Sequence, residues 1–124
     1  MGQTGAPTSR PKPLIDSDRV EGTAVYAANG HRIGTIKRLV IEKVSGKVVY
    51  VMISFGGFLG FGDQVHAIPW EKLDYDPTLG GYRTDVTEDQ IRSSPNFLHD
   101  EHWSDREREK DVHEHFHVPP YWLP

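Results

Sequence analysis

A short motif near the end of the chain has the residue types of a zinc site. The stretch VHEHFH contains His113, Glu114 and His117 in the order H-E-x-x-H. On a helix, this spacing places two histidines one turn apart on one face, where they can hold a metal ion while the glutamate acts as a base. His113 and His117 are therefore a candidate metal-binding pair.

A hydrolytic zinc centre requires more than this motif supplies. Catalytic zinc needs three protein ligands and an open position for water. Pro119 and Pro120 end the helix soon after the motif, so a third ligand would have to come from upstream residues such as His99, His102 or Asp100. Five of the seven histidines lie in residues 99–124, so composition alone can produce the motif. We expect no catalytic residue and no cofactor, and metal binding by this segment is the alternative function.

Large apolar residues occur in the same tail and in one glycine-rich loop. Val112 and Phe116 form a narrow i, i+4 stripe, which should dock the helix on its own barrel or on a second copy. The loop GGFLGFGD presents three large apolar side chains, which either plug the barrel or form a partner surface. The candidate interaction residues are Phe58, Leu59, Phe61, Trp103, Val112, Phe116, Tyr121 and Trp122.

The charge distribution argues against several classes of partner. The net charge of -4 sits entirely in residues 99–124, which carry three basic and seven acidic side chains. Because the rest of the chain is neutral and has no basic stripe, we expect no nucleic-acid binding. The longest uncharged run, residues 48–62, is too short and too glycine-rich to span a membrane, so direct membrane contact is not expected. Without cysteine or a signal-peptide pattern, a cytoplasmic location is expected.

The residues upstream of the tail form short β-prone runs separated by turn signals. Asn29-Gly30 predicts a type I′ hairpin turn, and Gly34 predicts a bulge or bend in the strand that follows. The run VVYVMISF predicts a central strand covered on both faces, and Pro69 should end pairing of the next strand. The predicted strands are Thr23–Ala27, His31–Val44, Val48–Phe55, Gln64–Ile68, Asp74–Asp76 and Tyr82–Thr84. Such spacing indicates a small β-barrel.

Two capping signatures predict helices after the strands. Thr87 with Gln90 opens a short helical turn that reaches about Arg92. Ser104 with Glu107 opens a longer helix, from Asp105 to about Phe116. Helices therefore follow the strands and do not alternate with them, as expected for a mostly β domain.

The run NGHRIGTIKRLVIEKVSGKVVYVMISFGGFLGFGDQVHAIPWEKL resembles the PRC-barrel family. The resemblance rests on I-G-x-I at residues 33–36, S-G-K at 45–47, the Val-rich strand, the Gly/Phe loop and I-P-W-x-x-L at 68–73. It spans about Ile15 to Phe97 and implies a six-stranded SH3-like barrel. Known members include C-terminal domains of the photosynthetic reaction-centre H subunit and of a ribosome maturation factor. The family has no common catalytic residue, so the resemblance implies an interaction module.

These observations give a definite expectation for the whole chain. We predict a flexible leader over residues 1–14, a mostly β barrel domain over 15–97, and an acidic, histidine-rich helical extension over 98–124. The expected function is non-enzymatic protein binding, with an unknown protein partner and assembly as a homo-oligomer. Self-assembly is expected because a small core carries an apolar loop and an aromatic-rich tail.

Overall fold

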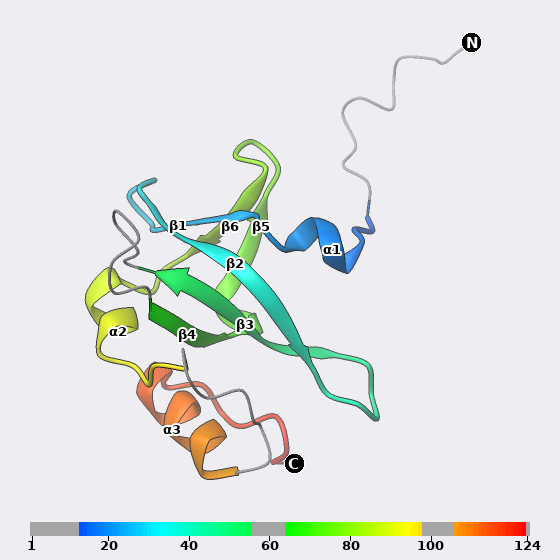
Figure 1. Ribbon diagram of the computed structural model, residues 1–124, viewed down its shortest axis with the longest axis vertical. Helices are drawn as coiled ribbons and strands as arrows, with labels where there is room; N and C mark the ends of the chain where they lie inside the picture. Colours follow the sequence, from blue (N-terminus) through cyan, green and yellow to red (C-terminus); the bar gives the residue numbers. More distant parts are fainter. Residues whose placement is uncertain (1–12, 56–63, 98–105, 124) are drawn as a thin grey trace.

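A computed structural model of the protein describes residues 13–55, 64–97 and 106–123. Six strands form one curled sheet in the order β4-β3-β2-β1-β6-β5 (Figure 1). All neighbouring strands are antiparallel except β1 and β6, which run parallel. The strands are β1 (Ala24–Tyr26), β2 (Arg32–Ile41), β3 (Val48–Phe55), β4 (Gln64–Pro69), β5 (Leu73–Asp76) and β6 (Gly81–Thr84). The predicted mostly β, six-stranded fold with a C-terminal helix is confirmed.

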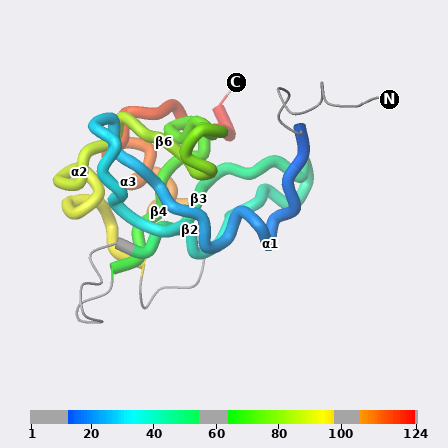
Figure 2. Tube along the Cα trace, turned by 90° about the horizontal axis from the view of Figure 1, so that it is seen from above, coloured from blue at the N-terminus to red at the C-terminus, as the bar shows by residue number. Residues whose placement is uncertain are grey.

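Short helices lie at both ends of the sheet. They are α1 (Ser17–Val20), the 3-10 turn η3 (Trp70–Lys72), α2 (Glu88–Arg92) and α3 (Arg106–Phe116). The capping box of α2 is confirmed, because the Thr87 hydroxyl accepts from the Gln90 backbone and the Gln90 side chain accepts from the Thr87 backbone. The prediction missed α1. Figure 2 shows α2 and α3 together at one end, with α1 and the β2–β3 hairpin at the other.

The turn between β1 and β2 differs from the predicted type I′ geometry. Gly30 has a positive φ of 90°, but Asn29 is not among the described non-glycine residues with positive φ. The Gly30 N–H donates to the Ala27 carbonyl, and the Ala27 N–H donates to the His31 carbonyl. This is a three-residue loop with one left-handed glycine. The Asn29 side chain accepts from the His31 N–H, so it holds the turn without a left-handed backbone of its own.

One further strand prediction is confirmed and another needs correction. Pro69 ends the pairing of β4 as predicted, because it is the last residue of the strand and lies opposite Tyr50 of β3. A proline is tolerated there because β4 is an edge strand, where one N–H has no ladder partner. β3 is next to this edge and is not the central strand of the sheet.

β3 is nevertheless covered on both of its faces, as predicted. Tyr50, Val51, Met52 and Ile53 are each at most 1% exposed, although successive strand residues point to opposite faces. One face lies in the barrel core and the other lies against the side of the molecule that carries α3, which packs against β4. Both faces of this strand therefore contribute to stability.

Gly34 lies where β2 passes very close to β3, and the pairing of β1 with β2 is irregular beside it. A Cβ atom at this position would stand 2.5 Å from Ile53 Cγ2 and 2.8 Å from the Ser54 carbonyl oxygen. The predicted irregularity at Gly34 is thus confirmed. Only glycine permits this approach of the two strands.

Candidate functional site at the C-terminal helix

Helix α3 turns its apolar stripe toward the body of the protein. Val112 and Phe116 are 0% and 2% exposed, and both belong to the hydrophobic core together with Val118. Burying two such side chains contributes about 3–6 kcal/mol of transfer free energy. These two predicted interaction residues therefore hold the helix on its own barrel.

The helix ends before the last residue of the H-E-x-x-H motif. His117 has a left-handed backbone, with φ at 57°. Its N–H donates to the Glu114 carbonyl at 3.3 Å, and the Val118 N–H donates to the His113 carbonyl at 3.0 Å. This pair of bonds is a Schellman motif, in which the left-handed position usually holds glycine. His117 consequently lies outside the helix, so His113 and His117 do not share one helical face.

The imidazole of His113 has partners within the chain on both sides. It is 4% exposed, with Nδ1 at 3.1 Å from the Val118 carbonyl oxygen and Nε2 at 2.7 Å from the Tyr50 hydroxyl. His117 is exposed. Among the described ranges, no group of three or more His, Asp or Glu side chains could hold a metal ion. The proposed upstream ligands His99, Asp100 and His102 lie outside the described residues.

His113 belongs to a polar group with the buried residues Tyr50 and Glu109 and with Tyr121, which is 41% exposed; we call this group the tail cluster. The Tyr50 and Tyr121 hydroxyls lie 2.9 Å and 2.7 Å from the same Glu109 oxygen, Oε1. The other Glu109 oxygen is 3.6 Å from Arg106 Nε. The cluster joins β3, α3 and the C-terminal segment 117–123 at one point.

The two tyrosine hydroxyls of the tail cluster lose their protons less readily than ordinary tyrosines. Burial, and then the hydrogen bond to Glu109, raises the pKa of Tyr50 far above its usual value. The same two causes raise the pKa of Tyr121 to about 12. Both phenols therefore remain protonated near neutral pH and act as hydrogen-bond donors. Neither can serve as a phenolate nucleophile, which gives the cluster a structural character.

A groove of about 550 Å³ opens beside the tail cluster. Its lining combines apolar and charged side chains of α3 and the C-terminal segment. The Arg106 guanidinium covers the Trp122 ring, 4.1 Å from its centroid, and so helps to fix one side of the segment. The lining residues are Lys110, His113, Glu114, His117, Val118, Pro119, Pro120, Trp122 and Leu123. We call this surface the tail groove.

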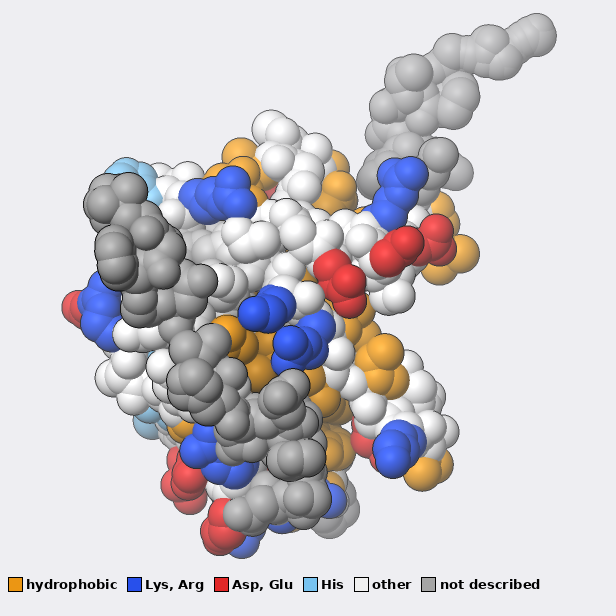
Figure 3. Space-filling model, viewed as in Figure 1, with side chains coloured by type: hydrophobic (Ala, Val, Ile, Leu, Met, Phe, Trp, Pro, Cys, Tyr) orange, Lys and Arg blue, Asp and Glu red, His pale blue; other side chains and the backbone are white. Residues whose placement is uncertain are grey.

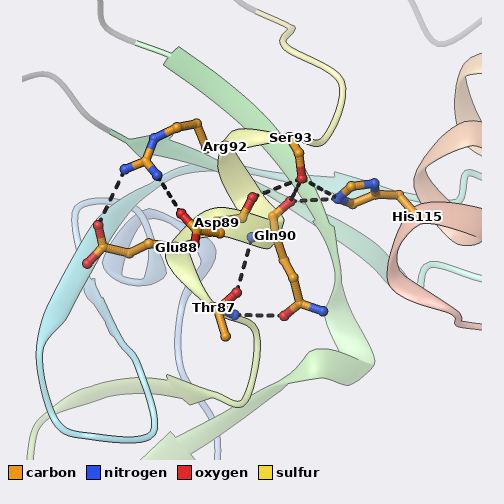
Figure 4. Close-up of polar contacts among 7 residues, drawn as sticks. All are labelled: Thr87, Glu88, Asp89, Gln90, Arg92, Ser93 and His115. Atoms are coloured by element: carbon orange, nitrogen blue, oxygen red, sulfur yellow. Dashed lines mark hydrogen bonds and ion pairs between the residues drawn. The ribbon is translucent and has the colours of Figure 1, made fainter.

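A second polar contact joins α3 to α2. His115 Nε2 lies 2.6 Å from the Gln90 carbonyl oxygen, so this nitrogen donates, and it is 3.4 Å from the Ser93 hydroxyl (Figure 4). The capping box and two ion pairs of Arg92, with Glu88 and Asp89, keep α2 in shape for this contact. The helix is thus held by polar contacts on two sides.

A second buried histidine lies under α2. His66 of β4 is 1% exposed, with Nδ1 at 2.8 Å from the Ser94 hydroxyl and Nε2 at 2.9 Å from the Gln64 side chain. The Ser94 hydroxyl donates onward to the Ile91 carbonyl at 2.7 Å. Burial lowers the pKa of His66, and the hydrogen bonds with residues 94 and 95 only partly oppose this effect. His66 is therefore neutral in the folded protein near pH 7.

The predicted interaction residues fall into three groups. Val112 and Phe116 are buried, whereas Tyr121 is 41% exposed and Trp122 is partly buried beside the tail groove. Phe58, Leu59, Phe61 and Trp103 lie outside the described residues. Tyr50 and Glu109 were not predicted, although a tyrosine inside an otherwise apolar strand generally needs a polar partner. The sequence offers such a partner in Glu109, four residues before His113.

One face of the molecule is mixed in character. Figure 3 shows basic, acidic and apolar side chains interspersed over one face, without a continuous stripe of one sign. In the described part of the chain, no helix is both long enough and apolar enough to cross a membrane.

Comparison with known proteins places this architecture in a family. An uncharacterized protein from Deinococcus radiodurans is 24% identical over 90 residues, which are 73% of this chain and 32% of that protein, so the chain spans about a third of its length. A structure from Pseudomonas aeruginosa, described as the 16S ribosomal RNA processing protein RimM, superposes with a TM-score of 0.45 at 19% identity. It covers 67% of this chain and 49% of RimM. The family model of the PRC-barrel domain matches residues 13–91, and the chain belongs to this family.

Proposed function

We propose that this chain is a non-enzymatic protein-interaction module that assembles with a second copy of itself through the tail groove. The observation that carries this proposal is the groove itself, a concave surface lined largely by apolar residues of the C-terminal segment. Leu123 is 56% exposed at this surface. An apolar projection and an apolar groove on one segment suit an isologous contact between two copies.

The charges beside the groove favour the same occupant. Lys110 of α3 carries a positive charge and Glu114, one turn later, a negative one. Across a two-fold axis, each can face the opposite charge of the second copy, so the surface is self-complementary. Other exposed apolar residues, such as Val44 at 93% and Leu14 at 86%, line none of the described hollows. Apolar side chains scattered singly are ordinary on protein surfaces.

A non-enzymatic role agrees with the state of the polar groups beside the groove. The hydroxyl protons of Tyr50 and Tyr121 are held firmly, and both nitrogens of His113 are engaged within the chain. A general base must be able to reach a substrate proton. In the described residues the tail cluster offers no such group to a ligand in the groove.

Sedimentation velocity over micromolar to submillimolar concentrations tests the proposal. The wild-type protein should show a concentration-dependent dimer, and Leu123→Glu should shift it to monomer by placing a buried charge in the interface. Val44→Glu is the matched control, since it changes a more exposed apolar residue on the β2–β3 hairpin. A monomer at every concentration, or equal disruption by both variants, would refute the proposal.

A further inference from the structure

The hydrogen bonds of the tail cluster determine how many hydrogens it must contain. They form a chain that runs from Tyr121 through Glu109, Tyr50 and His113 to the Val118 carbonyl. Each of these contacts requires one hydrogen between its two heavy atoms. The Val118 carbonyl can only accept, so Nδ1 of His113 carries a hydrogen.

The hydrogens of the two tyrosine hydroxyls and of one ring N–H are too few for these four contacts. Each tyrosine supplies one hydrogen, and a neutral His113 supplies only the hydrogen on Nδ1. With Glu109 ionised, these three hydrogens must serve four contacts. One contact would then bring two lone pairs together at less than 3 Å. The geometry is satisfied only when the cluster holds one more proton.

We propose that this extra proton resides on His113, as the cationic partner of a Glu109 carboxylate, with the Tyr50 hydroxyl as the bridge between them. His113 Nε2 then donates to Tyr50, and Tyr50 donates to Glu109. Arg106 Nε lies 3.6 Å from the second Glu109 oxygen and favours the ionised carboxylate. The cluster is therefore a buried proton-binding site with no net charge on the Glu109–His113 pair.

The other charged groups around His113 do not remove the need for this proton. Lys110 and Glu114 of α3 line the tail groove with opposite charges, and His117 lies at the same surface. From the β2–β3 hairpin, Glu42 acts on the cluster through Tyr121. These groups lie at the edge of the site, where water screens them, whereas Glu109 is 6% exposed.

The proton links pH to the attachment of the tail. When it leaves, one hydrogen bond between β3, α3 and the C-terminal segment is lost and a buried polar atom is left unsatisfied. Docking of α3 should therefore weaken as the pH rises through the titration of the site. This pH-dependent attachment, which we call the latch, is made by contacts within one chain, and His113 also lines the tail groove.

The Glu109→Gln variant tests whether the docking of α3 depends on the extra proton. The amide of Glu109→Gln brings its own hydrogens, which can be donated to Tyr50 and Tyr121. Tyr50 can then donate to a neutral His113, and every contact is satisfied without the extra proton. The variant should keep α3 docked and remove the pH dependence, a result that a purely packing role for Glu109 does not predict.

Long-range ¹⁵N–¹H spectroscopy of the full chain at about pH 6.5, where an ordinary histidine is half protonated, tests the assignment. Wild-type His113 should carry hydrogens on both ring nitrogens, and only on Nδ1 in Glu109→Gln. Exposed His117 serves as the internal control, because the substitution should leave its signals unchanged. A bare Nε2 on His113 in the wild type would overturn the proposal. If Glu109→Gln does not fold, the wild-type spectrum alone tests the proposal.

Amide hydrogen exchange tests the latch. After correction for intrinsic exchange, protection of the α3 amides should fall about tenfold in the wild type between about pH 6 and pH 8, the effect of one lost buried hydrogen bond. In Glu109→Gln the fall should be less than about twofold. Equal falls in both proteins, or none in the wild type, would overturn the link between the proton and docking.

Discussion

His66 and His113 are both almost fully buried, at 1% and 4% exposure, but they have different polar neighbours. His66 faces the Ser94 hydroxyl and the Gln64 amide, which are neutral groups. The Gln64 oxygen Oε1 faces Nε2 at 2.9 Å, and turning the amide over presents its NH₂ instead, so that a neutral ring satisfies both contacts. His113 faces a carbonyl on one side, and on the other a hydroxyl whose hydrogen goes to a carboxylate. Its ring must therefore donate twice.

This contrast shows that burial alone does not decide the charge of a histidine. Burial disfavours the imidazolium in both places. The supply of hydrogens by the neighbouring groups decides the outcome, and a carboxylate within the network changes that supply. The two ends of the α2–α3 region therefore respond to pH in opposite directions, although each rests on a single buried ring.

The largest effect should come from removing the bridge of the tail cluster. Tyr50→Phe keeps the ring packed but leaves Nε2 of His113 and one donor position at Glu109 without a partner. We expect a loss of about 2–3 kcal/mol in the free energy of unfolding, measured by urea denaturation at pH 7. Tyr75→Phe, at a residue that is 50% exposed, should change it by less than about 0.5 kcal/mol. A small loss for Tyr50→Phe would mean that the cluster does not couple β3 to α3.

Much of the fold could be predicted from the sequence because it depends on local chemistry. The apolar run of β3, the hairpin of β5 and β6 and the capping box at Thr87 all have signals within a few residues. The backbone of Asn29 could not be predicted from the dipeptide alone, because its side chain accepts from the His31 N–H and leaves the left-handed position to Gly30.

The site depended on contacts that sequence spacing does not contain. Tyr50 and His113 are 63 residues apart in sequence, and only the docking of α3 brings them together. The H-E-x-x-H motif was also misleading, because the motif assumes a continuous helix. The left-handed residue that ends α3 is the histidine at position 117, where a sequence pattern would look for glycine.

The pH dependence of stability should distinguish the two histidines. Because the pKa of His66 is lowered in the folded state, the unfolded chain takes up a proton first as the pH falls through about 6.5. The His66 contribution is therefore complete above that pH and is lost below it, at no more than about 1.4 kcal/mol per pH unit. His66→Gln should flatten this part of the curve.

The measurement is the difference between wild type and His66→Gln in urea denaturation across acidic to neutral pH. Taking the difference cancels the contribution of the tail cluster, which has the opposite sign. Stability that falls as steeply with acid in His66→Gln as in the wild type would contradict the neutral assignment of His66.

The smallest effect should come from substitution of His117. This change alters the backbone at the end of α3 without removing a hydrogen bond of the tail cluster. The His117 φ of 57° costs energy for a residue with a Cβ atom, so His117→Gly should stabilise the protein by about 0.5–1 kcal/mol. Glu114→Gly, at an exposed helical position, should instead destabilise it by about 0.5–1 kcal/mol. Thermal unfolding of both variants measures the two shifts. Because His117 makes no bond in the tail cluster's hydrogen-bond chain, His117→Gly should leave the pH dependence of α3 protection unchanged; a flattened dependence would assign the proton to His117 in place of His113.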